Sequence, residues 1–329
     1  MPRKRLPAPV DMGDVFSVSA ARRAGHTRAS RNNSDLVRPF RGTRVLPDLN
    51  PPSPEPEDAF RSSPTLEMMT RLRALSTVMS RHAFFEGPTA ALLNHVPAPA
   101  TTTTNLYVAT PVGRTPPVRN HTDIKARTLS PRLVTVVKRE GLRSLDAPTS
   151  WASCGKHLDL ANLLAAADTL LWAEPPPPPG SNRRPKAPRY TKEQLQAVLD
   201  RGRWANIALL RQALSLSTDR SASVPESKFR LSMVDAGLPA PELNADIFED
   251  GIFLANADFV FRKYKVCVEY QSAYHRSAKQ YEADRRRMDG LRDAEWLPIE
   301  ITHQSAVKEP WRGIKEVTRA LMRRGWEPA

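Results

Sequence analysis

The chain has 329 residues, a length that predicts roughly two or three domains and allows more than one hydrophobic core. Its 49 Lys and Arg residues outnumber its 35 Asp and Glu residues, and the net charge of +14 favours a polyanionic partner, most commonly nucleic acid; a generally basic composition is the plainer alternative. The two cysteines, Cys154 and Cys267, fall in no C-x-x-C spacing, which argues against a disulfide framework and a zinc ribbon.

These features predict a soluble, cytoplasmic protein without a membrane partner. The first residues are basic but lack the apolar core of a signal peptide. The longest apolar stretch, residues 160–173, contains Asn162 and Asp168 and is too short to cross a bilayer. Reduced cysteine thiols fit the same compartment.

Residues 1–46 predict a small, basic, winged-helix-like module. Ser19 is expected to cap a short helix that ends at Gly25, Thr27 starts a second helix, and two short strands follow. Two short helices before a basic hairpin are typical of winged-helix DNA-binding domains. The alternative is a disordered basic leader. The candidate DNA contacts in this module are Arg38, Arg41 and Arg44.

Two Pro-rich segments, 47–64 and 174–190, are predicted to be linkers. Between them, residues 65–173 predict a small α+β middle domain with helical, then strand-like, then strongly apolar helical patterns. This domain has no nucleotide-binding glycine loop, no H-E-x-x-H and no G-x-S-x-G motif.

Residues 191–329 predict an α/β domain with a mixed sheet. Thr191 begins one helix, and a later helix has Ser223 as its N-cap, Pro225 in its first turn and Gly237 at its end. The expected strands lie near 243–248, 252–261, 265–271 and 296–302, and the two further helices near 278–294 and 309–324.

Two acids interrupt the apolar hairpin formed by the second and third of these strands. With Lys263 and Tyr264 at the centre of the turn, Asp258 and Glu269 become cross-strand neighbours with Cβ atoms roughly 5 Å apart. Gln271 lies on the same face. Two carboxylates and an amide suit Mg²⁺ or Mn²⁺, which can polarise a phosphodiester and activate a water. The alternative is a solvent-facing pair neutralised by Lys or Arg.

Other polar residues near this hairpin each allow two interpretations. Glu226 completes an S-x-x-E capping box with Ser223 or supplies a third carboxylate. Asp284 lies on the apolar stripe of its helix, where it pairs with Arg287 or belongs to the site. His275 could serve as acid, base or phosphate contact or simply lie on the surface. The helix arginines that could contact phosphates or remain solvated are Arg285, Arg286 and Arg287.

Residues 221–324 resemble the restriction-endonuclease-like PD-(D/E)XK superfamily, in a branch similar to very-short-patch repair endonucleases. The resemblance rests on "VPESKFRLSMVDAGLPAPELN", "ANADFVF", "VCVEYQSAYHR" and "QYEADRRRMDGLRDAEWLPIEIT". It implies a magnesium-dependent nuclease fold in which Asp258 and Glu269 hold the metal, and Gln271 stands where many relatives have Lys or Asp. The implied catalytic residues are Glu226, Asp258, Glu269, Gln271, His275 and Asp284.

The preceding modules are more weakly similar to proteins that join a short winged helix to a domain like the type IV abortive-infection antitoxins. This similarity rests on "DLVRPFRGTRVL", "GPTAALLNHVP" and "LDAPTSWASCGKHLDLANLL". Three functions therefore compete. The first is a DNA endonuclease, possible in repair or phage defence. The second is a non-catalytic, antitoxin-like DNA-binding regulator with a degenerate nuclease domain. The third is a defence protein that contacts a toxin or another partner.

Overall fold

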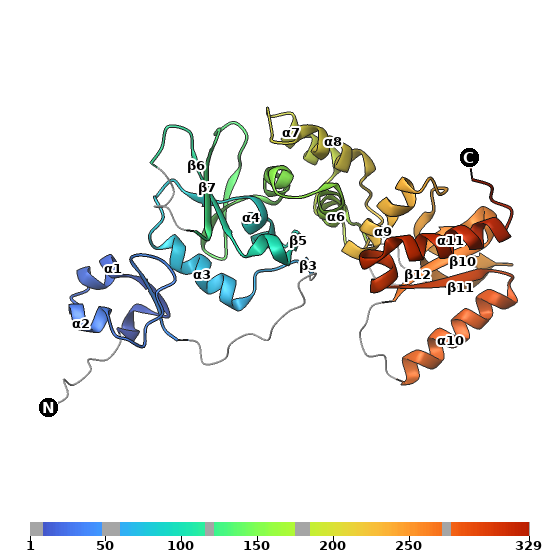
Figure 1. Ribbon diagram of the computed structural model, residues 1–329, viewed down its shortest axis with the longest axis horizontal. Helices are drawn as coiled ribbons and strands as arrows, with labels where there is room; N and C mark the ends of the chain where they lie inside the picture. The colour runs from blue at the N-terminus through green and yellow to red at the C-terminus, as the bar shows by residue number, and fades with distance from the viewer. Residues whose placement is uncertain (1–8, 48–59, 116–121, 175–184, 272–277, 329) are drawn as a thin grey trace. The chain divides into compact units, whose positions relative to one another are not determined.

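The protein is a mixed α/β chain that forms two compact units. One unit contains residues 1–158 with 196–207, and the other contains residues 159–195 with 208–329. The computed structural model describes residues 9–47, 60–115, 122–174, 185–271 and 278–328 (Figure 1).

The N-terminal module of the first unit combines short helices with a small antiparallel sheet. Ser17, not the predicted Ser19, caps the first helix by accepting the Ala20 N–H, because it is the residue with extended backbone directly before the helical turn. Thr27 caps the second helix, as predicted. The elements are η1 (Val10–Met12), β1 (Val15–Ser17), α1 (Val18–Arg23), α2 (Arg28–Arg31) and β2 (Thr43–Val45).

The rest of the first unit is built on a five-stranded mixed sheet in the order β7-β6-β4-β9-β8. Phe84 and Phe85 alternate across it, so each packs into a separate buried cluster. The strands are β3 (Phe60–Arg61), β4 (Phe84–Phe85), β5 (Ala98–Pro99), β6 (Leu106–Pro111), β7 (Ile124–Leu129), β8 (Val136–Arg139) and β9 (Leu142–Leu145). The helices are α3 (Leu66–Ser76), α4 (Gly87–Leu93), η2 (Ala100–Thr103), α5 (Ala147–Ser153) and η3 (Cys154–Lys156).

The second unit contains a four-stranded sheet in the order β10-β11-β12-β13, antiparallel except for the last pair. The predicted mixed sheet is therefore confirmed. Its strands are β10 (Glu242–Glu249), β11 (Ile252–Phe261), β12 (Val266–Gln271) and β13 (Leu297–Thr302). The helices are α6 (Leu160–Leu171), α7 (Lys192–Leu199), α8 (Ile207–Leu216), α9 (Val224–Asp235), η4 (Arg262–Tyr264), α10 (Ala278–Asp293), η5 (Gln304–Lys308) and α11 (Pro310–Arg323). The division between the two units falls within α7 and within α8.

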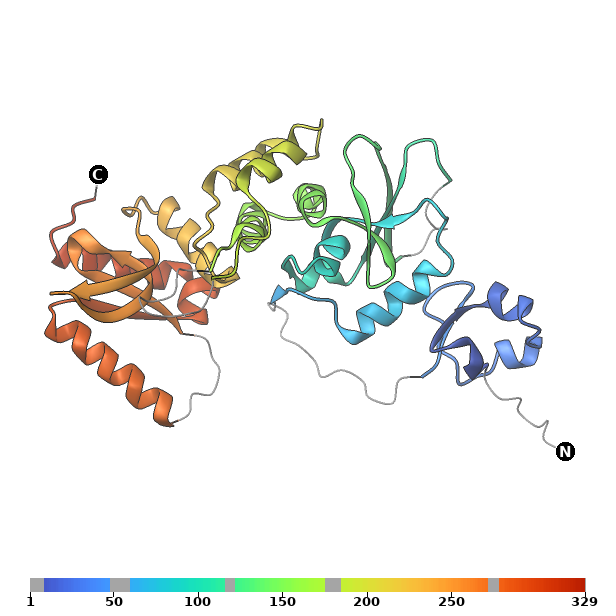
Figure 2. The same ribbon diagram turned by 180° about the vertical axis from the view of Figure 1, so that it is seen from behind.

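Helices cover both faces of this sheet (Figures 1 and 2). Helices α9 and α11 pack on the face that carries Phe259 and Val268. Met288 and Leu291 of α10 pack on the opposite face, against Val260 and Cys267. Glu269 follows Cys267 by two residues on β12 and therefore belongs to the α10 face, where it contacts Arg287. It lies in a covered layer of the fold and not on a solvent-facing sheet.

The predicted hairpin register is confirmed, but its turn is longer. Phe259 pairs with Val268 and Phe261 with Val266, as the sequence arithmetic requires. Lys and Tyr are unfavourable in a tight two-residue hairpin turn, because its preferred types need positive φ at one or both central residues. The chain instead makes the 3-10 turn Arg262–Tyr264 and places Lys265 in the left-handed region, with φ of 46°.

Helix α6 belongs to the second unit, whereas the sequence interpretation assigned it to a middle domain that ends at residue 173. The reason is a buried ion pair. Asp168 of α6 is 1% exposed and lies 2.9 Å from the guanidinium of Arg230 on α9. Leaving either charge buried without the other would be costly, so the pair attaches α6 to α9.

None of the helices in the described ranges is long and apolar enough to cross a membrane.

Candidate functional site

The last residue pair of the β11–β12 ladder is Phe259 with Val268. Asp258 and Glu269 are the next residue on each strand, just beyond this end of the ladder. Past this point the Asp258 carboxylate takes the place of a strand carbonyl: its Oδ2 accepts the backbone N–H of Tyr270 at 2.6 Å. Asp258 is thereby fixed at the end of the ladder, close enough to Glu269 for the two carboxylates to interact electrostatically. The structure thus brings the two predicted metal ligands to one place on the sheet.

Glu269 is 8% exposed and forms an ion pair with α10. Its Oε2 lies 2.7 Å from Nη2 of Arg287, a half-buried residue in the middle of that helix. A carboxylate removed from water requires a cation or several hydrogen bonds. Arg287 supplies positive charge to Glu269 in this structure.

Glu226 reaches the same region from the first turn of α9. Its carboxylate accepts the backbone N–H of Ala222 at 3.0 Å, the Ser223 hydroxyl at 2.7 Å and the Asn244 amide at 3.0 Å. Ser223 in turn accepts the Glu226 N–H. The predicted capping interaction is therefore present, and Glu226 is also close enough to act on Asp258 electrostatically.

The pKa of Asp258 reports how these groups interact. Burial is the main cause that raises this pKa to about 7, and the charges of Glu226 and Glu269 raise it further. The Tyr270 N–H and Arg287 act in the opposite direction. Perturbed carboxyl groups of this kind are typical of functional sites, although structural networks produce them too.

The remaining predicted site residues are only partly described. Gln271 is half-buried at the end of β12, on the face that carries Glu269. His275 lies outside the described residues, and Asp284 lies in α10 with its side chain outside the described part. Within the described ranges, no group of three or more His, Cys, Asp or Glu side chains is arranged to hold a metal ion.

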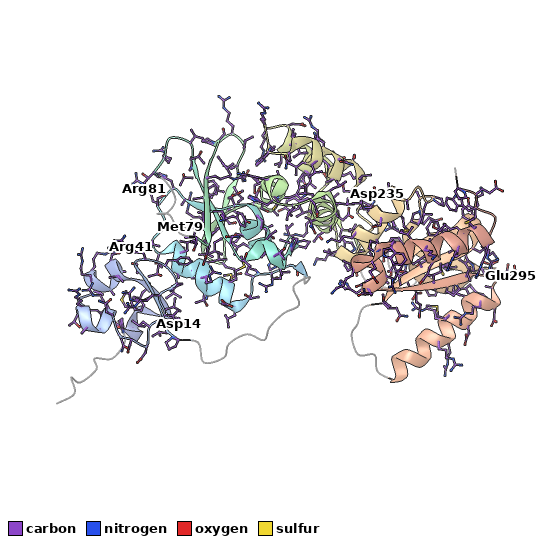
Figure 3. All side chains as sticks on the ribbon, in the orientation of Figure 1. Asp14, Arg41, Met79, Arg81, Asp235 and Glu295 are labelled. Carbon is purple, nitrogen blue, oxygen red and sulfur yellow. The ribbon has the colours of Figure 1, made fainter. Side chains whose placement is uncertain are left out.

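The six predicted DNA-contacting arginines differ in exposure. Arg285 and Arg286 are exposed on α10, and Arg38 and Arg41 are exposed in the N-terminal module (Arg41 is labelled in Figure 3).

Arg44 is buried, and its guanidinium donates to the Arg31 carbonyl at 2.8 Å, the Thr43 carbonyl at 2.6 Å and the Asn32 side chain at 2.6 Å. These bonds tie β2 to the end of α2. Arg44 thus organises the module, and Arg38 and Arg41 are the ones that present their charge to solvent.

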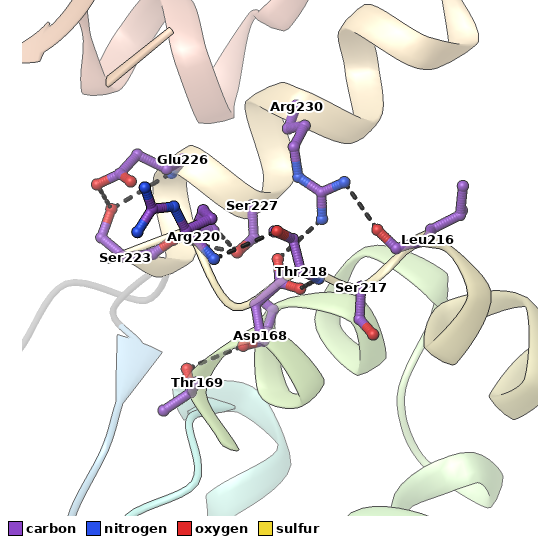
Figure 4. A network of polar contacts seen from close by, with 12 residues as sticks. Asp168, Thr169, Leu216, Ser217, Thr218, Arg220, Ser223, Glu226, Ser227 and Arg230 are labelled. Carbon is purple, nitrogen blue, oxygen red and sulfur yellow. Dashed lines mark hydrogen bonds and ion pairs between the residues drawn. The ribbon is translucent and has the colours of Figure 1, made fainter. Parts of the chain in front are cut away.

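Sequence reasoning missed the polar network that holds the start of α9 (Figure 4). Asp168 accepts the Thr218 N–H at 2.8 Å and Arg230 at 2.9 Å, while Arg230 also donates to the Leu216 carbonyl at 2.8 Å. Asn244 links the Arg220 carbonyl, at 2.7 Å, to Glu226. The available signal was Asp168 itself, an acid within a strongly apolar helix that needs a buried partner.

Comparison with known proteins gives a limited result. No protein-family profile and no solved structure matches the chain. The chain is similar to two Mycobacterium tuberculosis sequences, uncharacterized protein Rv2248 of strain H37Rv and uncharacterized protein MT2308 of strain CDC 1551. Each is 32% identical over 124 residues, which is 37% of this chain and 45% of the relative. The chain thus spans less than half the length of the relatives it matches.

Proposed function

We propose that this protein is a cytoplasmic DNA-binding protein whose C-terminal unit is a Mg²⁺-dependent or Mn²⁺-dependent DNA endonuclease, acting in phage defence or DNA repair. One observation carries the proposal. Asp258 and Glu269 lie close together at the end of the β11–β12 ladder, and burial, followed by the charges of Glu226 and Glu269, raises the pKa of Asp258. Clustered carboxylates at a covered position favour binding of a divalent cation.

The residues present fit such a cation. Carboxylate and amide oxygens are the hard ligands that Mg²⁺ prefers, and Mg²⁺ sites often use one or two carboxylates, with water and substrate phosphate completing the shell. A set smaller than three protein ligands is therefore sufficient. When bound, the ion would stabilise charge on the phosphodiester and lower the pKa of a water.

The chain's own residues would have distinct roles in this reaction. Asp258 and Glu269 would hold the ion, Gln271 would orient the attacking water through its amide, and Glu226 would add negative charge nearby. His275 and Asp284 are proposed to assist proton transfer or phosphate binding. Arg285 and Arg286, which are exposed on α10, would contact the DNA backbone.

A supercoiled-plasmid assay with Mg²⁺ or Mn²⁺ tests the activity. Asp258→Ala and Glu269→Ala are each expected to lower the nicking rate at least about a hundredfold, because each removes a ligand and its charge. Asp235→Ala, an exposed change at the end of α9, is the matched control and should cut like wild type. Nicking that survives both site substitutions would reject the site assignment.

DNA binding by the N-terminal module is a separate prediction. The first 45 residues contain ten Lys and Arg against three acids, and Arg38 and Arg41 are exposed. Arg38→Gln combined with Arg41→Gln should weaken DNA binding and reduce the slope of log affinity against log salt concentration by about 2. Fluorescence anisotropy at several salt concentrations measures this slope. Binding that is insensitive to salt would argue against a phosphate-contacting module.

A non-catalytic, antitoxin-like regulator is the second candidate, and a specific observation favours it. Arg287 already neutralises Glu269, and Gln271 carries no charge. A nuclease fold that has lost its chemistry would keep such an internal ion pair for stability. Intact DNA binding with no nicking of any substrate by wild type would support this function, in which a toxin or another defence protein becomes the expected partner.

A further inference from the structure

The ion pair between Arg287 and Glu269 lies where a metal-bound nuclease would need its cation. Nη2 of Arg287 is 2.7 Å from Oε2 of Glu269. The Glu269 side chain is 10% exposed, whereas that of Arg287 is 30% exposed. The Glu269 side chain is thus enclosed, and the Arg287 side chain is partly exposed to solvent.

The charge of Arg287 acts on both proposed metal ligands. Besides contacting Glu269 directly, it favours the charged form of Asp258. A divalent cation at the same carboxylates would therefore meet a positive charge a few ångströms away, and the repulsion would weaken its binding. Arg287 and the ion cannot both neutralise Glu269 at full strength.

We propose that Arg287 and the divalent cation compete for Glu269, and that a DNA phosphate releases the site by drawing Arg287 away from it. This inference rests on the proposed function. A guanidinium pairs well with phosphate through two parallel hydrogen bonds, and the partly exposed Arg287 side chain can turn towards solvent while α10 stays packed through Met288 and Leu291.

The exchange makes the metal site dependent on substrate. Without DNA, Arg287 satisfies the buried Glu269 and the ion binds weakly. With DNA, Arg287 contacts the phosphate and the ion takes its place. Because coupling between two ligands is reciprocal, DNA must tighten metal binding by the same factor by which the metal tightens DNA binding.

Titration calorimetry with Mn²⁺ tests this competition on the full chain. Arg287→Gln is expected to bind Mn²⁺ about tenfold more tightly than wild type in the absence of DNA, a factor within the usual range for coupled sites. Adding a short phosphorothioate duplex that resists hydrolysis, with the duplex alone as the blank, should tighten Mn²⁺ binding to wild type by a similar factor and change the variant little.

Arg292→Gln is the matched control. It removes the same charge from the same helix and breaks a comparable ion pair, Arg292–Asp289 at 3.0 Å, in an exposed position. Its Mn²⁺ affinity should equal that of wild type. If Arg287→Gln does not fold, as judged by circular dichroism, the effect of DNA on wild type alone decides between competition and independence.

Different results would reject the competition and the metal site itself. Mn²⁺ affinity that is the same in wild type and Arg287→Gln, and is unaffected by DNA, would reject the competition while leaving a nuclease that depends on Asp258 and Glu269 intact. Absence of Mn²⁺ binding by every protein, with and without DNA, would reject the metal site itself and the competition with it.

Discussion

Asp258→Asn is expected to make the protein more stable than wild type at pH 8 and to abolish the proposed phosphodiester hydrolysis. The pKa of Asp258 is raised to about 7, chiefly by burial and then by the charges of Glu226 and Glu269. Between about pH 4 and pH 7 the folded protein therefore retains a proton that the unfolded chain has lost, so this group's contribution to stability falls as the pH rises through that window.

The size of the effect follows from the same linkage. Raising the pKa of an aspartate to about 7 lowers the free energy of unfolding by on the order of 4 kcal/mol once the carboxyl group is fully ionised. Asparagine has no charge to lose, and its side-chain oxygen can still accept the Tyr270 N–H. At pH 8 the free energy of unfolding of the variant should therefore exceed that of wild type by up to this amount. Near pH 4 the two proteins should be equally stable.

Urea unfolding of wild type and Asp258→Asn at pH 4, 6 and 8 measures this difference. A gap between the two proteins that stays constant across the pH range would show that Asp258 is not the titrating group. Saturating Mg²⁺ should reduce the gap at pH 8, because a bound cation stabilises the ionised wild-type site and has less to bind in the variant.

Breaking the Asp168–Arg230 pair is expected to be the most destabilising polar substitution in the second unit. Asp168→Ala leaves Arg230, whose side chain is 11% exposed, without its 2.9 Å ion-pair partner and removes the acceptor of the Thr218 N–H. Removing one member of a buried pair typically costs about 3–5 kcal/mol. Because the pair joins α6 to α9, the loss should also loosen the first turn that carries Glu226.

A double substitution separates loss of charge pairing from loss of packing. Asp168→Leu combined with Arg230→Met removes both charges and keeps comparable volume, so it should recover much of the stability lost in Asp168→Ala. Asp235→Ala is the exposed control and should change stability by no more than about 0.5 kcal/mol. Thermal unfolding of the four proteins gives the comparison. Equal losses in Asp168→Ala and Asp235→Ala would contradict the assigned role of the pair.

The sequence predicted those parts of the candidate site whose residues follow one local pattern, such as strand alternation or a capping motif. The alternation along residues 257–271 predicted that Asp258, Glu269 and Gln271 share one face. The structure confirms the register of the hairpin, with Phe259 opposite Val268, and the ladder ends just before Asp258 and Glu269. The S-x-x-E spacing likewise predicted the contact between Ser223 and Glu226. Whether these residues bind a metal and cleave DNA stays a prediction.

Local pattern alone determined the order of helices and strands in the C-terminal region, the mixed sheet, the cap at Ser223 and the hairpin register, because period, capping and turn residues act between near neighbours. Only the tertiary structure decided the rest: that α6 joins α9 through Asp168, that Arg44 is buried, and that Arg287 faces Glu269. Each of these depends on which distant surfaces meet, and a charged side chain chooses its partner only when packing has removed water from both.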